Sequence, residues 1–239
     1  MILHRLIGHH LKYGDDAAFY RMQAEDAITW METCGRVLAP SLRTLDLGCG
    51  HGVFGKSLMQ KGCQVTFADV DCQLEPELRS QPFLSVDLDK DDYRSLGTYP
   101  FIVCSNVFEH LASPQRFLSQ IGQTLEPGGW LYLSWTNWLS PWGGHDFSPF
   151  HYLGPVWGPR LYDRLIGKPR IHQPFETLYP TYIGQTLDWI RQEPHLECLH
   201  CVPRYYPEFA WITQCPLIRE FLAWNTALLI RKRAQRFGQ

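Results

Sequence analysis

The segment PWGGHDFSPFHYLG, residues 141–154, concentrates side chains that bind metals, transfer protons or close over ligands. His145 and Asp146 are adjacent, and His151 follows six residues after His145. A histidine beside a carboxylate is typical of an acid–base pair in which the carboxylate orients or charges the imidazole. The same residue types can hold a metal ion, and the glycines and aromatic residues are typical of a lid. Three interpretations follow: a metal site, an acid–base pair and a closing loop.

A second pair, Glu109 and His110, follows the apolar run FIVCSNV. If that run is a strand, both side chains lie at its end, where either could act on a substrate. An acid in this place can also stabilise the N-terminus of a following helix. The predicted catalytic residues are therefore His145, His151, Asp146, Glu109 and His110, with purely structural hydrogen bonding as the alternative for the loop residues.

A glycine loop, Asp46-Leu-Gly48-Cys-Gly50-His-Gly52, precedes both segments. Alternating glycines let the backbone turn tightly and lie against a ligand. The same residues contain Gly50-x-Gly52-x-x-Gly55, the dinucleotide pattern, which would indicate a nicotinamide-dependent oxidoreductase. That pattern uses a helix N-terminus to hold pyrophosphate and has little use for an aspartate just before the loop. A ligand with a cationic amino-acid tail would favour the carboxylate.

The elements that must position these residues are strands alternating with helices. Short, unalternating apolar runs are typical of a parallel sheet covered on both faces. We predict an N-terminal helix over residues 15–39, ended by Pro40, and a ligand-binding core over residues 42–136. Residues 137–180, rich in Pro, Gly and aromatic residues, break the pattern and form an insertion after the fifth strand, the lid segment. Helices and strands return over residues 181–239, including helices over YIGQTLDWIRQ and CPLIREFLAW.

These motifs together resemble class I S-adenosylmethionine-dependent methyltransferases. DLGCGHG resembles the first motif of that family, and Asp69 ends the next strand, where the family binds the ribose hydroxyls. SVDLD places Asp87 where the family often contacts the adenine amino group, and CSNVFEHL and LEPGGWLYLS resemble the fourth and fifth strands. One departure is Phe101-Ile102, where the family often has Phe-Asp.

The resemblance implies a Rossmann-like α/β fold, a seven-stranded and mostly parallel sheet with helices on both faces, in a single domain. It implies S-adenosylmethionine as cofactor and no metal. The residues that it assigns to the cofactor are Asp46, Gly48, Cys49, Gly50, Gly52, Asp69, Val70, Asp87, Leu88, Ser105 and Asn106.

The lid segment and the later run PRYYPEFAW also resemble a smaller set of bacterial methyltransferases of type 11. We predict methyl transfer to a small-molecule acceptor, an oxygen of a sugar, lipid or secondary metabolite, with glycan-linked or lipid-linked acceptors suggested only by association. The alternatives are the oxidoreductase and a protein that binds S-adenosylmethionine without catalysis.

Composition limits the partners of the chain. A net charge of −2 over 239 residues implies no strong field for nucleic acid, since proteins that bind it usually have a basic face. Eight scattered cysteines are typical of reduced thiols in a cytoplasmic protein. Cys198-Leu-His200-Cys201 has half the spacing of a zinc site, but a buried strand is favoured there. The basic end RKRAQRFGQ could contact a membrane peripherally. The sequence does not indicate an oligomeric state.

Overall fold

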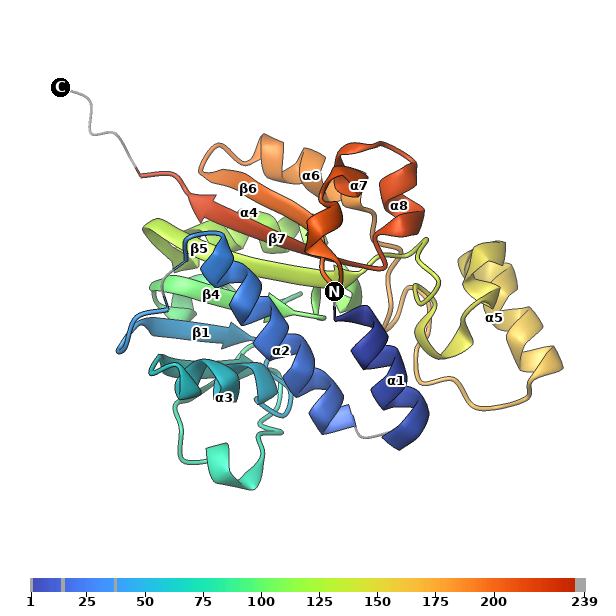
Figure 1. The fold of residues 1–239 in the computed structure, drawn as a ribbon, viewed down its shortest axis with the longest axis horizontal. Coiled ribbons are helices and arrows are strands. Elements are labelled where there is room, and N and C mark those ends of the chain that lie inside the picture. Colours follow the sequence, from blue (N-terminus) through green and yellow to red (C-terminus); the bar gives the residue numbers. More distant parts are fainter. Residues whose placement is uncertain (1, 14–15, 37, 235–239) are drawn as a thin grey trace.

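A computed structural model describes residues 2–13, 16–36 and 38–234 (Figure 1). Most of the basic C-terminal tail, residues 235–239, therefore lies outside the described residues. All eight cysteines are free thiols. Across the described ranges, no helix has the length and apolar character needed to cross a bilayer.

One seven-stranded sheet organises the chain, in the order β3-β2-β1-β4-β5-β7-β6. The strands are β1 Arg43–Leu47, β2 Gln64–Asp69, β3 Phe83–Ser85, β4 Tyr99–Ser105, β5 Leu125–Thr136, β6 Leu196–Pro203 and β7 Asn225–Lys232. Neighbouring strands are parallel, except that β7 runs antiparallel to both β5 and β6. The predicted Rossmann-like, mostly parallel sheet is confirmed.

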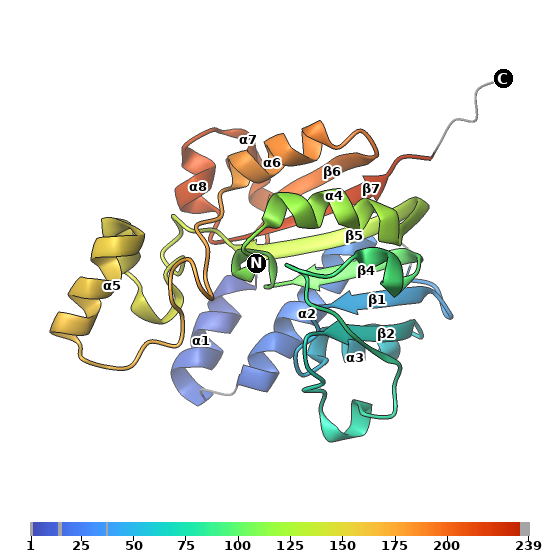
Figure 2. The ribbon, with the colours of Figure 1, turned by 180° about the vertical axis from the view of Figure 1, so that it is seen from behind.

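Helices cover both faces of this sheet, as predicted. Helices α2 (Asp16–Thr33) and α3 (Val53–Gln60) lie on the face shown in Figure 1, and α4 (Pro114–Thr124) and α6 (Ile183–Gln192) lie on the face shown in Figure 2. Each face has its own apolar core. Met31 and Tyr132 belong to the first core, and Phe117 and Leu133 to the second. This two-sided burial explains why the strands read as continuous apolar runs.

The N-terminal region differs from the prediction of one helix over residues 15–39. Helix α2 ends at Thr33, well before Pro40. Gly35 adopts a φ of 78°, and the backbone N–H groups of Gly35 and Arg36 donate to the carbonyl oxygens of Glu32 and Met31. These are the two hydrogen bonds of a glycine-terminated helix end, so Gly35 ends the helix. A further helix, α1 (Leu3–Tyr13), was not predicted.

Two long segments leave and rejoin the sheet at the carboxyl edge of its parallel strands. The first is the lid segment, which carries α5 (Gly154–Leu165) well outside the sheet (Figure 1). Its apolar side chains Trp138, Phe147, Tyr162 and Leu178 form a small separate core. The second segment, residues 204–224, carries α7 (Trp211–Gln214) and α8 (Ile218–Leu222). The helix predicted over CPLIREFLAW is present only as the shorter α8, and α7, which precedes it, was not predicted.

Candidate active site

The glycine loop connects β1 to α3 at the carboxyl edge of the sheet. Gly48 has a φ of 70°, and a Cβ atom there would lie 2.4 Å from a methyl group of Val107. A Cβ atom on Gly50 would meet no atom within 4 Å, so the space in front of this residue is open. The loop therefore packs closely against the end of β4 on one side and presents bare backbone on the other.

Two aspartates hold the glycine loop and the start of α3 by hydrogen bonds to the backbone. The Gly55 N–H donates to Asp46 Oδ2 at 2.8 Å, and the Gly50 N–H donates to Asp69 Oδ2 at 2.8 Å. Asp46 is only 3% exposed, and this burial raises its pKa from 3.8 to about 7. Asp46 thus lies under the loop, whereas the half-buried Asp69 lies at its side.

The ends of β2 and β3 continue the surface beside Asp69. Val70 is 53% exposed, an unusual state for a branched apolar residue at the end of a strand. Asp87 accepts hydrogen bonds from the Asp89 N–H and from Lys90 Nζ, and the Lys90 bond lowers the pKa of Asp87. Leu88 is buried, and Cys49 is half-buried in the loop. Among Cys49, Val70 and Leu88, Val70 is the one whose apolar side chain is largely exposed.

The end of β4 is tied into a buried polar network. Asn106, with a left-handed φ of 57°, accepts hydrogen bonds at Oδ1 from Arg204 Nη1 (3.1 Å) and Asn225 Nδ2 (3.0 Å). Arg204 also donates to Ser134 Oγ, which itself bonds to Ser105 Oγ. Sequence reasoning identified Ser105 and Asn106 but missed Arg204, because its partners come from strands distant in the sequence.

A cavity of about 510 Å³ opens beside Asn106, between the N-terminal helices, the lid segment and residues 204–224. One part of its wall is apolar and aromatic, and another part is polar. The lining residues are Leu3, Leu6, Ile7, Phe19, Tyr20, Gln23, Asn106, Glu109, His110, Thr136, Trp142, His145, His172, Tyr205 and Trp224. Asn106 links the two features, because it lines the cavity and precedes Val107, against which Gly48 packs.

Glu109 stands at the polar part of this cavity and is 1% exposed. Its Oε1 accepts a hydrogen bond from the Thr136 N–H at 2.8 Å, and its Oε2 is buried without a hydrogen-bond partner. Glu109 lies in a short 3-10 helix, Phe108–His110, and α4 begins only at Pro114. Its carboxylate accepts from the Thr136 N–H at the end of β5, so it differs from the predicted alternative of an acid at the N-terminus of the following helix. A carboxylate oxygen that is buried and unpaired is available to a ligand.

Three histidines share the polar part of the cavity with Glu109. His110 follows β4, whereas His145 and His172 come from the two limbs of the lid segment. Their ring centroids lie 4.6–5.5 Å apart in all three pairings. His172 was not predicted, since the sequence separates it widely from both partners.

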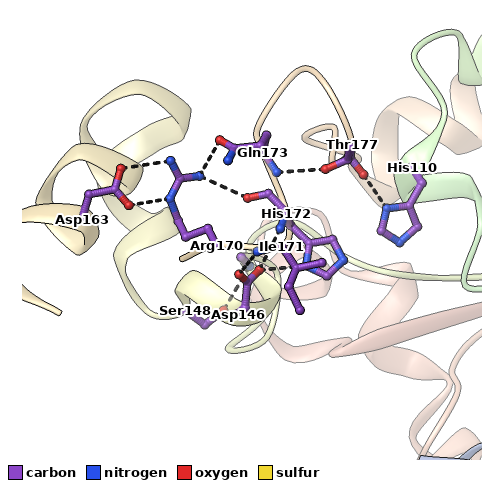
Figure 3. Close-up of polar contacts among 10 residues, drawn as sticks. His110, Asp146, Ser148, Asp163, Arg170, Ile171, His172, Gln173 and Thr177 are labelled. Atoms are coloured by element: carbon purple, nitrogen blue, oxygen red, sulfur yellow. Dashed lines mark hydrogen bonds and ion pairs between the residues drawn. The ribbon is translucent and has the colours of Figure 1, made fainter. Parts of the chain in front are cut away.

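Asp146 orients His172, not the histidines that the sequence pattern suggested. Figure 3 shows its carboxylate accepting from the N–H of Ile171 (2.7 Å) and bonded to His172 Nδ1 (2.7 Å). The pairing with the adjacent His145, or with His151, is therefore not formed. His151 is fully buried, with Nε2 bonded to the Ser140 carbonyl oxygen at 2.9 Å, and does not line the cavity.

The return limb of the lid segment, residues 170–180, is bonded to α5 at one end and to residues 109–110 at the other. Arg170 forms a two-pronged ion pair with Asp163 on α5, at 2.8 and 3.1 Å (Figure 3). His110 Nδ1 bonds to the Thr177 carbonyl oxygen at 2.6 Å, and the Tyr179 N–H donates to the Glu109 carbonyl oxygen. The lid segment is thereby docked on the end of β4.

Known proteins similar to this chain agree on one class. The pattern of the family described as a methyltransferase domain matches residues 19–200. An uncharacterized methyltransferase of Mycolicibacterium vanbaalenii is 32% identical over 227 residues, covering 89% of this chain and 87% of the relative. One from Mycobacteroides abscessus is 30% identical over 230 residues, covering 90% and 87%.

Solved structures give the same result for the fold. The magnesium protoporphyrin IX methyltransferase of Synechocystis, solved with bound S-adenosylhomocysteine, superposes with a TM-score of 0.56. The match covers 92% of this chain and 88% of that protein, at 15% identity.

Proposed function

The chain belongs to the class I S-adenosylmethionine-dependent methyltransferases, and we propose that it methylates an oxygen of a small molecule bound in the cavity beside Asn106. The membership makes the protein an enzyme with S-adenosylmethionine as its cofactor. It replaces both the nicotinamide interpretation of the glycine loop and that of a non-catalytic binding protein.

The residues present fit this cofactor. The open space in front of Gly50 leaves room for a ligand against bare backbone. Asp69 lies beside it as an acceptor for hydroxyl groups, and the exposed Val70 offers an apolar surface to an aromatic ring. Cys49, Ser105 and Asn106 complete the proposed cofactor contacts along the carboxyl edge, and Asp87 and Leu88 those after β3. Asp46 contributes from beneath the loop by holding it in shape.

The observation that carries the proposal is the cavity, which has Asn106 in its wall and combines apolar walls with the unpaired Glu109 Oε2. S-adenosylmethionine supplies an electrophilic methyl group whose departure leaves a neutral thioether. The chain must hold an acceptor in line with that group and exclude water, so positioning supplies much of the rate. Phe19, Tyr20 and Trp142 provide the apolar enclosure.

Glu109 is the residue we assign as the base. Its Oε2 takes the proton of the acceptor hydroxyl as the new carbon–oxygen bond forms and the carbon–sulfur bond breaks. His145 is a poorer base, because burial and the neighbouring His110 and His172 lower its pKa to about 3. His110 and His145 then position the acceptor, and His151 and Asp146 act through the shape of the lid segment.

The acceptor is proposed to be a small molecule, free or as part of a glycan or lipid, and not a nucleic acid. Magnesium protoporphyrin IX methyltransferase, a structural neighbour, is named for an acceptor of this size class. A cytoplasmic location and at most peripheral membrane contact belong to the same proposal.

Calorimetry with S-adenosylmethionine, followed by transfer of a labelled methyl group to sugar, lipid and phenolic alcohols, tests the proposal. We expect saturable cofactor binding and labelling of an oxygen. Labelling only of a nitrogen or carbon atom would contradict the oxygen assignment, and no cofactor binding by the folded protein would refute the proposed activity.

A further inference from the structure

The histidine trio, His110, His145 and His172, brings one ring nitrogen of each residue to within 4.8 Å of the others. The three residues come from separate segments, so the fold and not local sequence assembles them. Within the ranges that the structure describes, no fourth histidine, cysteine or carboxylate joins the group. The trio lines the cavity that we assign to the acceptor.

Hydrogen bonds orient the rings of His110 and His172 through Nδ1, which leaves Nε2 of each ring for another partner. His110 Nδ1 lies 2.6 Å from the Thr177 carbonyl oxygen, which can only accept, so this nitrogen carries the proton. His172 Nδ1 lies 2.7 Å from Asp146 Oδ1, and Asp146 Oδ2 accepts from the Ile171 N–H, so Nδ1 is the ring nitrogen that bonds to the carboxylate. In the neutral form of each ring, Nε2 is then the nitrogen that carries the lone pair.

The third ring lacks a partner. His145 Nδ1 is buried and has no hydrogen-bond partner. Histidine binds a metal ion through the lone pair of an unprotonated ring nitrogen. Three imidazole rings thus converge in the cavity, and one of them has a buried nitrogen without a hydrogen-bond partner.

We propose that the histidine trio binds a divalent transition-metal ion, zinc or an ion of similar ligand preference, with at least one coordination position open to the cavity. Imidazole nitrogens suit such ions, whereas magnesium and calcium prefer oxygen ligands. Three protein ligands and one open position are the arrangement of catalytic zinc sites. Binding at about 2.0–2.1 Å draws the nitrogens to about 3.3 Å from one another, which rotation of the rings provides.

The outer contacts match those of metal-binding histidines. Such residues donate their second ring nitrogen to a carboxylate or a backbone carbonyl, which fixes the tautomer and the ring orientation. His172 does so to Asp146, and His110 to Thr177 (Figure 3). Asp146 is in turn held by the Ile171 and His172 N–H groups. Asp146, although adjacent to His145 in the sequence, thus orients His172 for metal binding.

A metal ion at this site would restrict which acceptors can bind, an inference that rests on the proposed function. An oxygen of the acceptor occupies the open coordination position, where the cation favours loss of the hydroxyl proton to Glu109. We therefore infer an acceptor whose methylated oxygen is a hydroxyl that can bind a metal ion, such as a phenol or a hydroxyl beside a second oxygen.

Titration of chelator-treated protein with cobalt chloride, followed by visible absorption and calorimetry, tests the site without any methyl transfer. We expect one cobalt ion per chain with the spectrum of a four-coordinate nitrogen site, and displacement by zinc. X-ray absorption of the cobalt-loaded wild type should show three imidazole ligands. No saturable binding, or a spectrum of a fully hydrated ion, overturns the proposal.

Variants separate this site from adventitious binding. His172→Ala and His145→Gln should each weaken cobalt binding at least about 100-fold, and Asp146→Asn about 10- to 100-fold. His200→Ala, an exposed histidine on β6, is the control and should not change it. Binding that survives both trio substitutions in folded protein overturns the site.

The two proposals fail differently. Cobalt binding to a protein that does not bind S-adenosylmethionine would refute the proposed activity alone. Methyl transfer that is unchanged after the bound metal has been removed would overturn the acceptor's contact with the ion.

Discussion

Asp46 should make the protein less stable as the pH rises from acid to neutral. Its carboxyl group is 3% exposed, and burial raises its pKa from 3.8 to about 7. Between these values the folded chain binds more protons at this group than the unfolded chain does. The free energy of unfolding therefore falls as the pH rises through this window, and the loss is complete above pH 7.

The size of the effect follows from the two pKa values. A difference of about 3 pKa units corresponds to about 4 kcal/mol in total. Titration curves with these end points place about 2.5 kcal/mol of that loss between pH 5 and pH 8. Asp46→Asn keeps an oxygen to accept the Gly55 N–H but cannot ionise. The substitution should thus remove this part of the pH dependence and stabilise the protein at pH 8.

Urea denaturation of the cofactor-free protein at pH 5 and pH 8 measures this difference. The wild type should lose about 2.5 kcal/mol more than Asp46→Asn between the two pH values. Asp188→Asn, which changes an exposed carboxylate on α6, is the matched control and should behave as the wild type. Equal pH dependence in the wild type and Asp46→Asn would refute the reasoning.

Four other substitutions test particular contacts. Gly48→Ala should lower both the melting temperature and the cofactor affinity, because the new Cβ atom clashes with Val107 and the φ is strained for alanine. Adding Val107→Ala removes the clash but not the strain, so it should recover part of both. No recovery would contradict the packing argument. Arg204→Met should cost about 2–3 kcal/mol in urea denaturation, since three hydrogen bonds of the buried guanidinium are lost. Glu109→Gln should slow methyl transfer about 100-fold or more with unchanged S-adenosylmethionine affinity, because the amide keeps the Thr136 contact but takes no proton; a pH–rate profile that keeps its shape would count against the base. His151→Ala should destabilise the lid segment by about 1–3 kcal/mol, as its buried ring bonds to the Ser140 carbonyl, and leave cofactor affinity unchanged.

The sheet and the glycine loop could be predicted because local signals specify them. Apolar strands, glycines and acids at strand ends lie within short stretches of sequence, and parallel strands bring their carboxyl ends to one edge. The sequence predicts that the N-terminal helix ends before Pro40, whereas the left-handed Gly35 comes first and ends it. Both signals were visible, and only the structure shows which of them ends the helix.

The polar part of the cavity could be predicted only in part. Glu109, His110 and His145 each lie within or directly beside a recognisable sequence motif. His172 and Arg204 do not, because their partners are separated from them by whole elements. The adjacent pair His145-Asp146 misled for a physical reason: neighbours in an irregular segment need not face each other, and Asp146 turns toward the return limb instead.

The two long segments at the carboxyl edge are each closed at the base by one backbone hydrogen bond. The Trp138 N–H donates to the Thr181 carbonyl oxygen at 3.1 Å, and the Arg204 N–H donates to the Asn225 carbonyl oxygen at 2.7 Å. The two ends of each segment thus lie close together. A change in the length of the segment therefore need not alter the pairing of the strands. Each segment can therefore be replaced without disturbing the sheet. A chimera that takes residues 139–180 from a relative should fold with the same sheet but with different cavity walls, and so with a different choice of acceptor.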